Sequence, residues 1–201
     1  MNETEHRYFI INKPANMVSQ FVSTHNVGLL GDLDFNFPEG IHAIGRLDNH
    51  SEGLLILTTN KKVTKLLFQG AVPHKRVYLV QVKNAVSEES LHKLRSGVTI
   101  RIKGDVDYVT TPCEVTVVTN PERIVQQAHA LPGYISVTWL QIILTEGKFH
   151  QVRKMVKAVH HKCKRLIRIS IEDLSLNGLA PGCVREIEEK DFFEQLKIEH
   201  W

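Results

Sequence analysis

The chain has 201 residues, of which 42% are hydrophobic and 23% are charged, and its formal net charge is +3. This ordinary globular composition excludes a disordered, collagen-like or membrane-spanning chain. Three widely spaced cysteines without a Cys-x-x-Cys pair argue against a disulfide framework and fit a reducing compartment. The charged N-terminus is not typical of a secretory signal, so we expect a cytoplasmic protein without a membrane segment.

Apolar alternation, turn residues and capping residues predict the elements of the first two thirds of the chain. A helix is expected after the capping residue Asn60 and before Gly70, and a second helix between Ser87 and Gly97. A Gly/Asp/Asn-rich loop is expected over 28–40. Strands are predicted over 9–11, 54–58, 77–82, 115–119 and 135–144.

The last third of the chain begins with a basic block. No Asp or Glu occurs over 147–171, and the eight cations of this stretch indicate a polyphosphate partner, although a solvated helix face remains an alternative. Apolar residues spaced i, i+3, i+4 and i+7 over 152–159 predict a helix, followed by a strand over 166–171 and a short helix near Phe192. The hairpin-like spacing of the strands favours an α+β fold with a mixed, mainly antiparallel sheet.

The common cofactor signatures are missing from the sequence. There is no phosphate-binding G-x-x-x-x-G-K-[ST] loop, no G-x-G-x-x-G after a strand, no H-E-x-x-H and no G-x-S-x-G. His160, His161 and Cys163 are poorly placed for one metal, because adjacent histidines point in different directions. We therefore expect neither a cofactor nor a metal.

The segment Gly45-Arg-Leu-Asp48 lies in a predicted loop before an apolar strand. An aspartate there is able to act as a nucleophile or base, with Arg46 binding a phosphate or a displaced base. A turn aspartate in a surface ion pair is the simpler alternative when this segment is considered alone.

Four segments together resemble the RsuA/RluB/E/F family of rRNA pseudouridine synthases, in the order that the family has them. The segment Gly45–Thr58 resembles its active-site motif, and Ile11-Asn-Lys-Pro14 its N-terminal motif. Arg76-Val-Tyr-Leu-Val80 resembles its third motif, and Leu144–Met155 its basic helix segment. The chain begins almost directly at the motif Ile11-Asn-Lys-Pro14, and its active-site motif has the form Asp-x-x-Ser-Glu-Gly over residues 48–53. Both features resemble the RluE branch of the family, which lacks an S4 domain.

The resemblance implies a catalytic domain over 8–187, with two lobes flanking a catalytic cleft, and an acidic C-terminal helix or tail over 188–201. The implied activity is that of an isomerase that converts a uridine of large-subunit rRNA into pseudouridine without a cofactor. Alternatives are the same chemistry on small-subunit rRNA or another RNA, and a non-catalytic RNA-binding or ribosome-assembly role. RNA is the expected partner, DNA is not, and a monomer is the default.

The resemblance also implies the site. Asp48 matches the catalytic aspartate, which attacks either the base or the ribose, and Arg153 matches the cation that pairs with it. Tyr78 matches the tyrosine that packs on the flipped base. Arg46 is expected to fill the space left by that base, and Leu166, with Ile167 as the alternative, to line the uracil pocket. The RNA-contact candidates are Lys13, Lys148, His150, Gln151 and Lys154.

Overall fold

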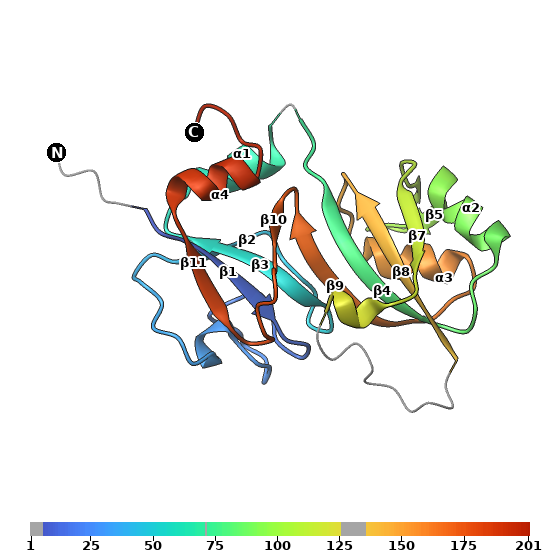
Figure 1. The fold of residues 1–201 in the computed structure, drawn as a ribbon, viewed down its shortest axis with the longest axis horizontal. Coiled ribbons are helices and arrows are strands. Elements are labelled where there is room, and N and C mark those ends of the chain that lie inside the picture. Colours follow the sequence, from blue (N-terminus) through green and yellow to red (C-terminus); the bar gives the residue numbers. More distant parts are fainter. Residues whose placement is uncertain (1–5, 71, 126–135) are drawn as a thin grey trace. The chain divides into compact units, whose positions relative to one another are not determined.

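The computed structural model of the chain describes residues 6–70, 72–125 and 136–201. The chain divides into two compact units. Unit 1 comprises Met1–His74 and Arg168–Trp201, and unit 2 comprises Lys75–Ile167. Strand β9 (Cys163–Ile171) begins in unit 2 and ends in unit 1 (Figure 1).

The strands of unit 1 pair in antiparallel fashion. Strand β1 (Tyr8–Lys13) lies between β11 (Val184–Ile187) and β3 (Glu52–Thr58). Strand β2 (His42–Ile44) pairs with β3, and β10 (Leu174–Ser175) pairs with the end of β9. A short 3-10 helix, η1 (Leu30–Asp32), interrupts the predicted loop over 28–40.

Both faces of the β1–β3 ladder are buried, because successive side chains of a strand point to opposite faces. One set of side chains packs with helices α1 (Val63–Phe68) and α4 (Glu189–Gln195), and the other packs under the loop segments. Each fully buried Leu, Ile or Phe stabilises the fold by about 1.5–3 kcal/mol. The helix-facing set includes Tyr8, Ile10, Leu54 and Ile56, and the loop-facing set includes Phe9, Ile11, Leu55 and Leu57.

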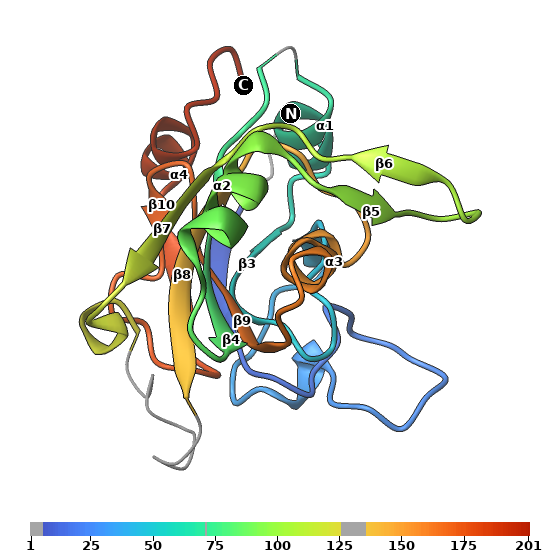
Figure 2. The same cartoon turned by 90° about the vertical axis from the view of Figure 1, so that its right-hand side faces the viewer.

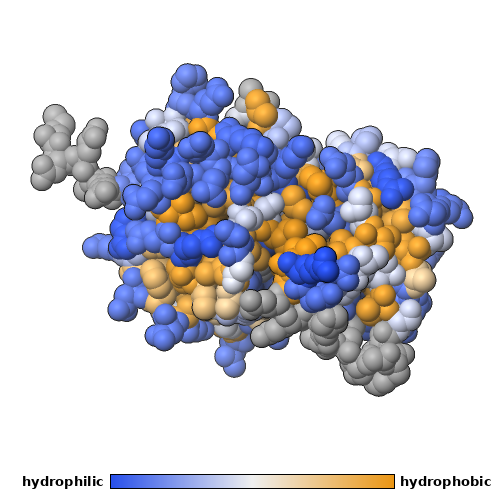
Figure 3. All heavy atoms as spheres, viewed as in Figure 1, coloured by the Kyte–Doolittle hydropathy of each residue, from blue (hydrophilic) through white to orange (hydrophobic). Residues whose placement is uncertain are grey.

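Helix α4 confirms the predicted C-terminal helix. Phe192 and Phe193 are fully buried and Leu196, its C-cap, joins them in the core of unit 1. Glu189 and Asp191 occupy the first turn, where carboxylates interact favourably with the helix dipole. The surface of this region is correspondingly hydrophilic (Figure 3).

The strands of unit 2 form two ladders. Strand β8 (Val137–Leu144) lies between β4 (Arg76–Lys83) and β7 (Glu114–Val118), with antiparallel pairing on both sides. Strands β5 (Thr99–Arg101) and β6 (Asp107–Val109) form a separate antiparallel pair, which extends away from the larger ladder (Figure 2). A 3-10 helix, η2 (Pro121–Arg123), follows β7, and Ile135 of the predicted strand lies outside the described residues.

Two helices pack on the sheet of unit 2 through one hydrophobic cluster. Helix α2 (Glu88–Ser96) begins where Ser87 Oγ accepts a hydrogen bond from the Ser90 backbone N–H at 3.2 Å, as predicted, and Gly97 ends it. Helix α3 (Gln151–Ala158) buries the predicted apolar stripe. Its buried residues Val152, Met155 and Val156, with Val159 beyond its end, join Leu91 and Leu94 of α2.

The predicted α+β class with mainly antiparallel pairing is confirmed. The short strands β2, β5, β6, β10 and β11 and the last residues of β1 were not predicted. Strand β1 continues through Asn12 and Lys13, because both residues pair with β3. The β5–β6 hairpin was not predicted, although Gly104-Asp105 at its turn, both with positive φ, is a recognisable turn signal. Within the described parts of the chain, no helix is long and apolar enough to cross a membrane.

Candidate functional site

Asp48 lies in the loop that joins β2 to β3. Its carbonyl accepts a hydrogen bond from the Ser51 N–H at 2.9 Å, which closes a tight turn over residues 48–51. The Asp48 side chain is half-buried and Arg46 is exposed. The loop therefore presents a partly exposed carboxylate on a backbone that the turn constrains.

Two residues of the segment that follows β1 brace this loop. The Ser19 hydroxyl accepts from the Leu47 N–H at 2.9 Å and donates to the Leu47 carbonyl at 3.0 Å, and Ser19 is buried. The Asn16 N–H donates to the Asn49 carbonyl at 2.8 Å, and a hydrogen bond of 3.1 Å joins Asn16 Oδ1 to His50 Nδ1. Sequence reasoning missed both supports. Asn16, with φ of 62°, is an asparagine in the left-handed region that such turns favour, but nothing marks Ser19.

Lys13 lies below the same loop and is fully buried. Its ammonium donates to the carbonyls of Met17 at 2.6 Å and Pro14 at 2.8 Å. Burial lowers the pKa of Lys13 to about 8, although the carboxylates of Glu52 and Asp48 act in the opposite direction. Lys13 was predicted to contact RNA, but in the structure its ammonium is buried and bound to the carbonyls of Pro14 and Met17, in the segment that follows β1.

Arg168, the last cation of the basic block, is also buried. Its Nε donates to the Leu54 carbonyl in β3 at 2.8 Å. The basic block was expected to bind a polyphosphate partner along its whole length. Arg168 does not take part in such a surface, because it is buried in unit 1.

In unit 2, Glu146 organises the loop that leads into α3. It accepts hydrogen bonds from the Tyr108 hydroxyl, from the Thr111 N–H at 3.0 Å and from Gln151 Nε2 at 2.6 Å. Burial raises the pKa of Glu146, but these hydrogen bonds outweigh it and hold the pKa below the ordinary value. Gln151 is buried, and its Oε1 also accepts from the Lys148 N–H at 2.8 Å. Gln151 was predicted to contact RNA, and the structure assigns it to this internal network instead.

The remaining predicted RNA contacts gather at the start of α3. Lys148 is exposed, with its ammonium 4.6 Å from the centroid of the Tyr108 ring. The His150 ring stacks on the Phe149 ring with centroids 3.8 Å apart, and the Lys154 ammonium lies 5.3 Å from the centroid of Phe149. The structure thus brings Lys148, His150 and Lys154 together around two aromatic side chains.

Arg153 and Tyr78 are half-buried residues of unit 2. Arg153 Nη1 lies 3.6 Å from the Cys163 sulfur, and burial raises the pKa of that thiol although Arg153 lowers it. Tyr78 on β4 pairs with Ile142 on β8 and packs against the hydrophobic cluster of unit 2, in which Leu166 is buried. Asp48 belongs to unit 1, so a site that combines it with these three residues stays a prediction.

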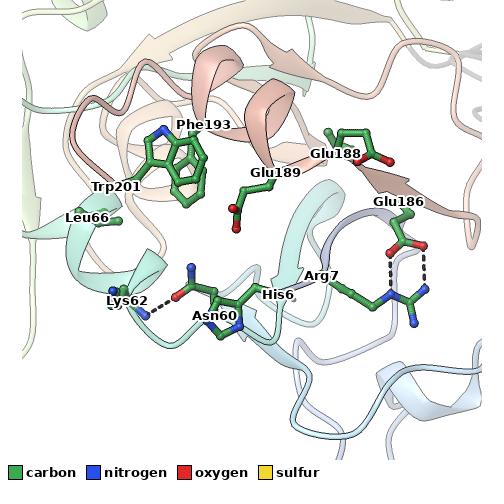
Figure 4. Close-up of a pocket in the computed structure, with 11 residues that line it drawn as sticks. His6, Arg7, Asn60, Lys62, Leu66, Glu186, Glu188, Glu189, Phe193 and Trp201 are labelled. Carbon is green, nitrogen blue, oxygen red and sulfur yellow. Dashed lines mark hydrogen bonds and ion pairs between the residues drawn. The ribbon is translucent and has the colours of Figure 1, made fainter. Parts of the chain in front are cut away.

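Unit 1 also contains a pocket with a volume of about 780 Å³ next to α1 and α4 (Figure 4). On one side Trp201 stacks on Phe193, with ring centroids 4.3 Å apart and an interplanar angle of 8°. Arg7 forms two hydrogen bonds of 2.6 and 2.7 Å with Glu186. None of the predicted site residues lines this pocket. Among the described residues, no group of three or more His, Cys, Asp or Glu side chains is arranged to hold a metal ion.

Comparisons with known proteins agree with the predicted resemblance. The RNA pseudouridylate synthase family model matches residues 7–158. A ribosomal large subunit pseudouridine synthase E of Vibrio parahaemolyticus is 35% identical over 185 residues, which cover 90% of this chain and 74% of that protein. A protein of the same name from Xanthomonas axonopodis is 33% identical over 178 residues, covering 86% of this chain and 89% of the relative.

The fold has a close counterpart among solved structures. A crystal structure described as a pseudouridylate synthase matches with a TM-score of 0.76 and 23% identity, covering 96% of this chain and 74% of the other. Formation of pseudouridine is an isomerisation, and the predicted enzyme class is confirmed by the family match. By the extent of that match and the identity to both relatives, this chain belongs to the RNA pseudouridylate synthase family.

Proposed function

We propose that this protein converts one uridine of large-subunit ribosomal RNA into pseudouridine. The substrate class is supported by the names of its relatives, which are large-subunit enzymes at 33–35% identity. The observation that carries the proposal is the braced loop of Asp48, in which Ser19 binds the backbone of Leu47 and Asn16 binds that of Asn49, on either side of one carboxylate. Residues 8–187 would act as the catalytic domain, in the cytoplasm and as a monomer.

The reaction breaks the bond from uracil N1 to ribose C1′, turns the base, and forms a bond from C5 to C1′, while C5 loses a proton and N1 gains one. A base that leaves the ribose must be kept in the site, which favours a covalent or tightly held intermediate. An ionised Asp48 carboxylate supplies the nucleophile whether it attacks the base or the ribose. No cofactor is needed, because the atoms of substrate and product are the same.

Residues of unit 2 would complete the site. Arg153 would pair with Asp48 and hold its carboxylate in place through a charge-assisted hydrogen bond. Tyr78 would pack on the flipped base and Leu166 would line the uracil pocket. Arg46, which is exposed on the Asp48 loop, would occupy the space that the flipped nucleotide leaves.

Pseudouridine mapping across total rRNA tests the proposal. Cells that lack the gene are compared with cells complemented by the wild type, by Asp48→Asn or by Asp34→Asn. Asp34 is a matched control, because it is an exposed loop carboxylate of the same unit. We expect one large-subunit site to disappear without the gene, to return with the wild type and Asp34→Asn, and to stay absent with Asp48→Asn.

The other outcomes decide between the alternatives. A lost site in small-subunit rRNA would keep the chemistry and replace the substrate. If Asp48→Asn restored the site, Asp48 would not be the nucleophile. If no site in any rRNA depended on the gene, the proposed substrate would be wrong and a binding role or another RNA would take its place.

A further inference from the structure

The loop before α3 exposes an aromatic ring that the predicted site does not use. Phe149 is 67% exposed, whereas Phe9, Phe192 and Phe193 are fully buried. An apolar ring of this size loses favourable burial when it remains in water. Phe149 is therefore a candidate for contact with a partner that covers it.

The ring is held in place by its neighbour. The planes of Phe149 and His150 are inclined by 20° and their centroids lie 3.8 Å apart, so the two rings form a stack. The backbone of His150 is left-handed, with φ of 55°, and its carbonyl accepts the Lys154 N–H at 3.0 Å where α3 begins. The stack is thus attached to the first turn of a helix whose apolar face is buried in the core of unit 2.

Cations surround this stack. The Lys154 ammonium lies 5.3 Å from the Phe149 centroid, and Lys148 is the preceding residue. Glu146, the carboxylate before them in sequence, is bound to Tyr108, Thr111 and Gln151. An exposed ring between lysines suits a ligand with a flat apolar face and adjacent anions, which describes a nucleotide better than an apolar protein surface.

We propose that Phe149, backed by His150, is a stacking platform for an unpaired nucleobase of the RNA substrate. Lys148 and Lys154 bind the phosphates on either side of this nucleotide, and Lys154 moves from the ring to a phosphate when the base stacks. The platform accepts any base, because every base has a flat face. The inference rests on the proposed function only for the identity of the RNA.

Binding of short RNA separates this platform from catalysis. The affinities of a fluorescein-labelled oligouridylate 12-mer and of a fully paired RNA hairpin are measured for the wild type, Phe149→Ala, Phe149→Leu and Phe149→Tyr. Val117→Ala is the control, because Val117 is an exposed apolar residue of β7 in the same unit. We expect Phe149→Ala and Phe149→Leu to bind the single strand roughly tenfold to a hundredfold more weakly, while Phe149→Tyr retains affinity.

The salt dependence and the site of contact give two further readouts. Phe149→Ala is expected to keep the salt slope of the wild type, whereas Lys148→Met with Lys154→Met reduces it, since only the lysines displace counterions. An RNA carrying 5-iodouridine should crosslink on irradiation to the peptide that contains Phe149. Equal affinity of Phe149→Leu and the wild type, or a crosslink that maps elsewhere, would overturn the platform.

These binding measurements do not depend on catalytic turnover. The stacking platform and the proposed conversion of an rRNA uridine can therefore be refuted independently of each other. Normal oligouridylate binding by Phe149→Ala, together with loss of an rRNA pseudouridine in Asp48→Asn cells, would refute the platform alone. Weak binding by Phe149→Ala, without any rRNA site that depends on the gene, would support the platform and refute the proposed substrate.

Discussion

Gly53 in β3 approaches Arg168 in β9 so closely that a Cβ atom on Gly53 would lie 2.2 Å from the Arg168 carbonyl oxygen. The Arg168 side chain returns to the same strand, where its Nε donates to the Leu54 carbonyl. Gly53 also has a φ of +101°, which side chains with a Cβ rarely adopt. This contact fixes the point at which the Asp48 loop enters β3.

Gly53→Ala is expected to destabilise the protein by on the order of 3 kcal/mol or more, because backbone on both strands must move. Gly40→Ala is the matched control. Gly40 has a φ of +76° but open space where its Cβ would be, so only backbone strain of about 1–2 kcal/mol is expected. Urea unfolding measures both variants, and similar losses would show that the close approach is unimportant.

Ser19→Ala should remove both hydrogen bonds to Leu47 and leave a buried N–H and carbonyl without those partners. The expected cost is about 1–3 kcal/mol, and kcat should fall while RNA affinity is retained, since Leu47 precedes Asp48. Release of tritium from RNA with 5-tritiated uridine measures kcat. Ser23→Ala, which changes a surface serine bonded to the His25 N–H, should leave kcat unchanged. An unaltered kcat in Ser19→Ala would show that this brace does not position the catalytic loop.

Lys13 should make stability depend on pH in alkaline solution. Its pKa is lowered from 10.5 to about 8 in the folded protein, so the unfolded chain binds more protons between these values. The free energy of unfolding therefore gains on the order of 3 kcal/mol from this group as the pH rises through that window. Below about pH 8 the buried charge is a constant penalty.

Urea unfolding of the wild type and Lys13→Met from pH 7 to 10.5 tests this contribution. Lys13→Met should be less stable at the higher pH values, because two carbonyls lose their donor, and should lack the rise. Lys61→Met changes an exposed lysine of the same unit and should keep it. Parallel curves for all three proteins would contradict a lowered pKa at Lys13.

Glu146 should stabilise unit 2 in neutral but not in acidic solution. Its pKa is lowered by hydrogen bonds from Tyr108, Thr111 and Gln151, so the stabilisation is complete above about pH 4.5 and is lost as the pH falls through the lowered value. Glu146→Gln should therefore unfold in less urea than the wild type at pH 7, and the difference should shrink at pH 3. Glu114→Gln, at an exposed position on β7, should show no such convergence.

Replacing Arg153 should reduce turnover, whereas replacing the surface lysines should reduce RNA affinity. Arg153→Leu is expected to reduce turnover on the order of a hundredfold or more with little change in RNA affinity, if its charge acts on Asp48. Replacing Lys148, Lys154, Lys157 and Lys164 by Met should weaken binding and reduce the salt slope by roughly 0.7 for each lost phosphate contact. Filter binding and single-turnover tritium release measure the two effects. Equal loss of affinity in both variants would contradict these separate roles.

Local patterns along the chain were enough to predict several elements. The stripe Val152, Met155 and Val156 predicted α3, and Ser87 with Gly97 predicted the bounds of α2, because helix periodicity and capping involve only neighbours in sequence. The four ordered motifs predicted the family in the same way. These inferences hold without knowledge of distant contacts.

Long-range contacts determined the features that local patterns did not predict, namely the end of β1 and the burial of several polar side chains. Strand β1 extends through Lys13 because β3, some forty residues away, pairs with its last residues. Lys13 is buried, and its ammonium binds the carbonyls of Pro14 and Met17, although the sequence had predicted an RNA contact. Arg168 is bound to Leu54, 114 residues away, and Gln151 to Glu146, which in turn binds the distant Tyr108 and Thr111. A charged or polar residue type fixes what a side chain is able to bind. Only the folded chain determines whether water, RNA or a backbone carbonyl is the partner. A buried side chain contacts neither water nor RNA, so it must bind a group within the protein.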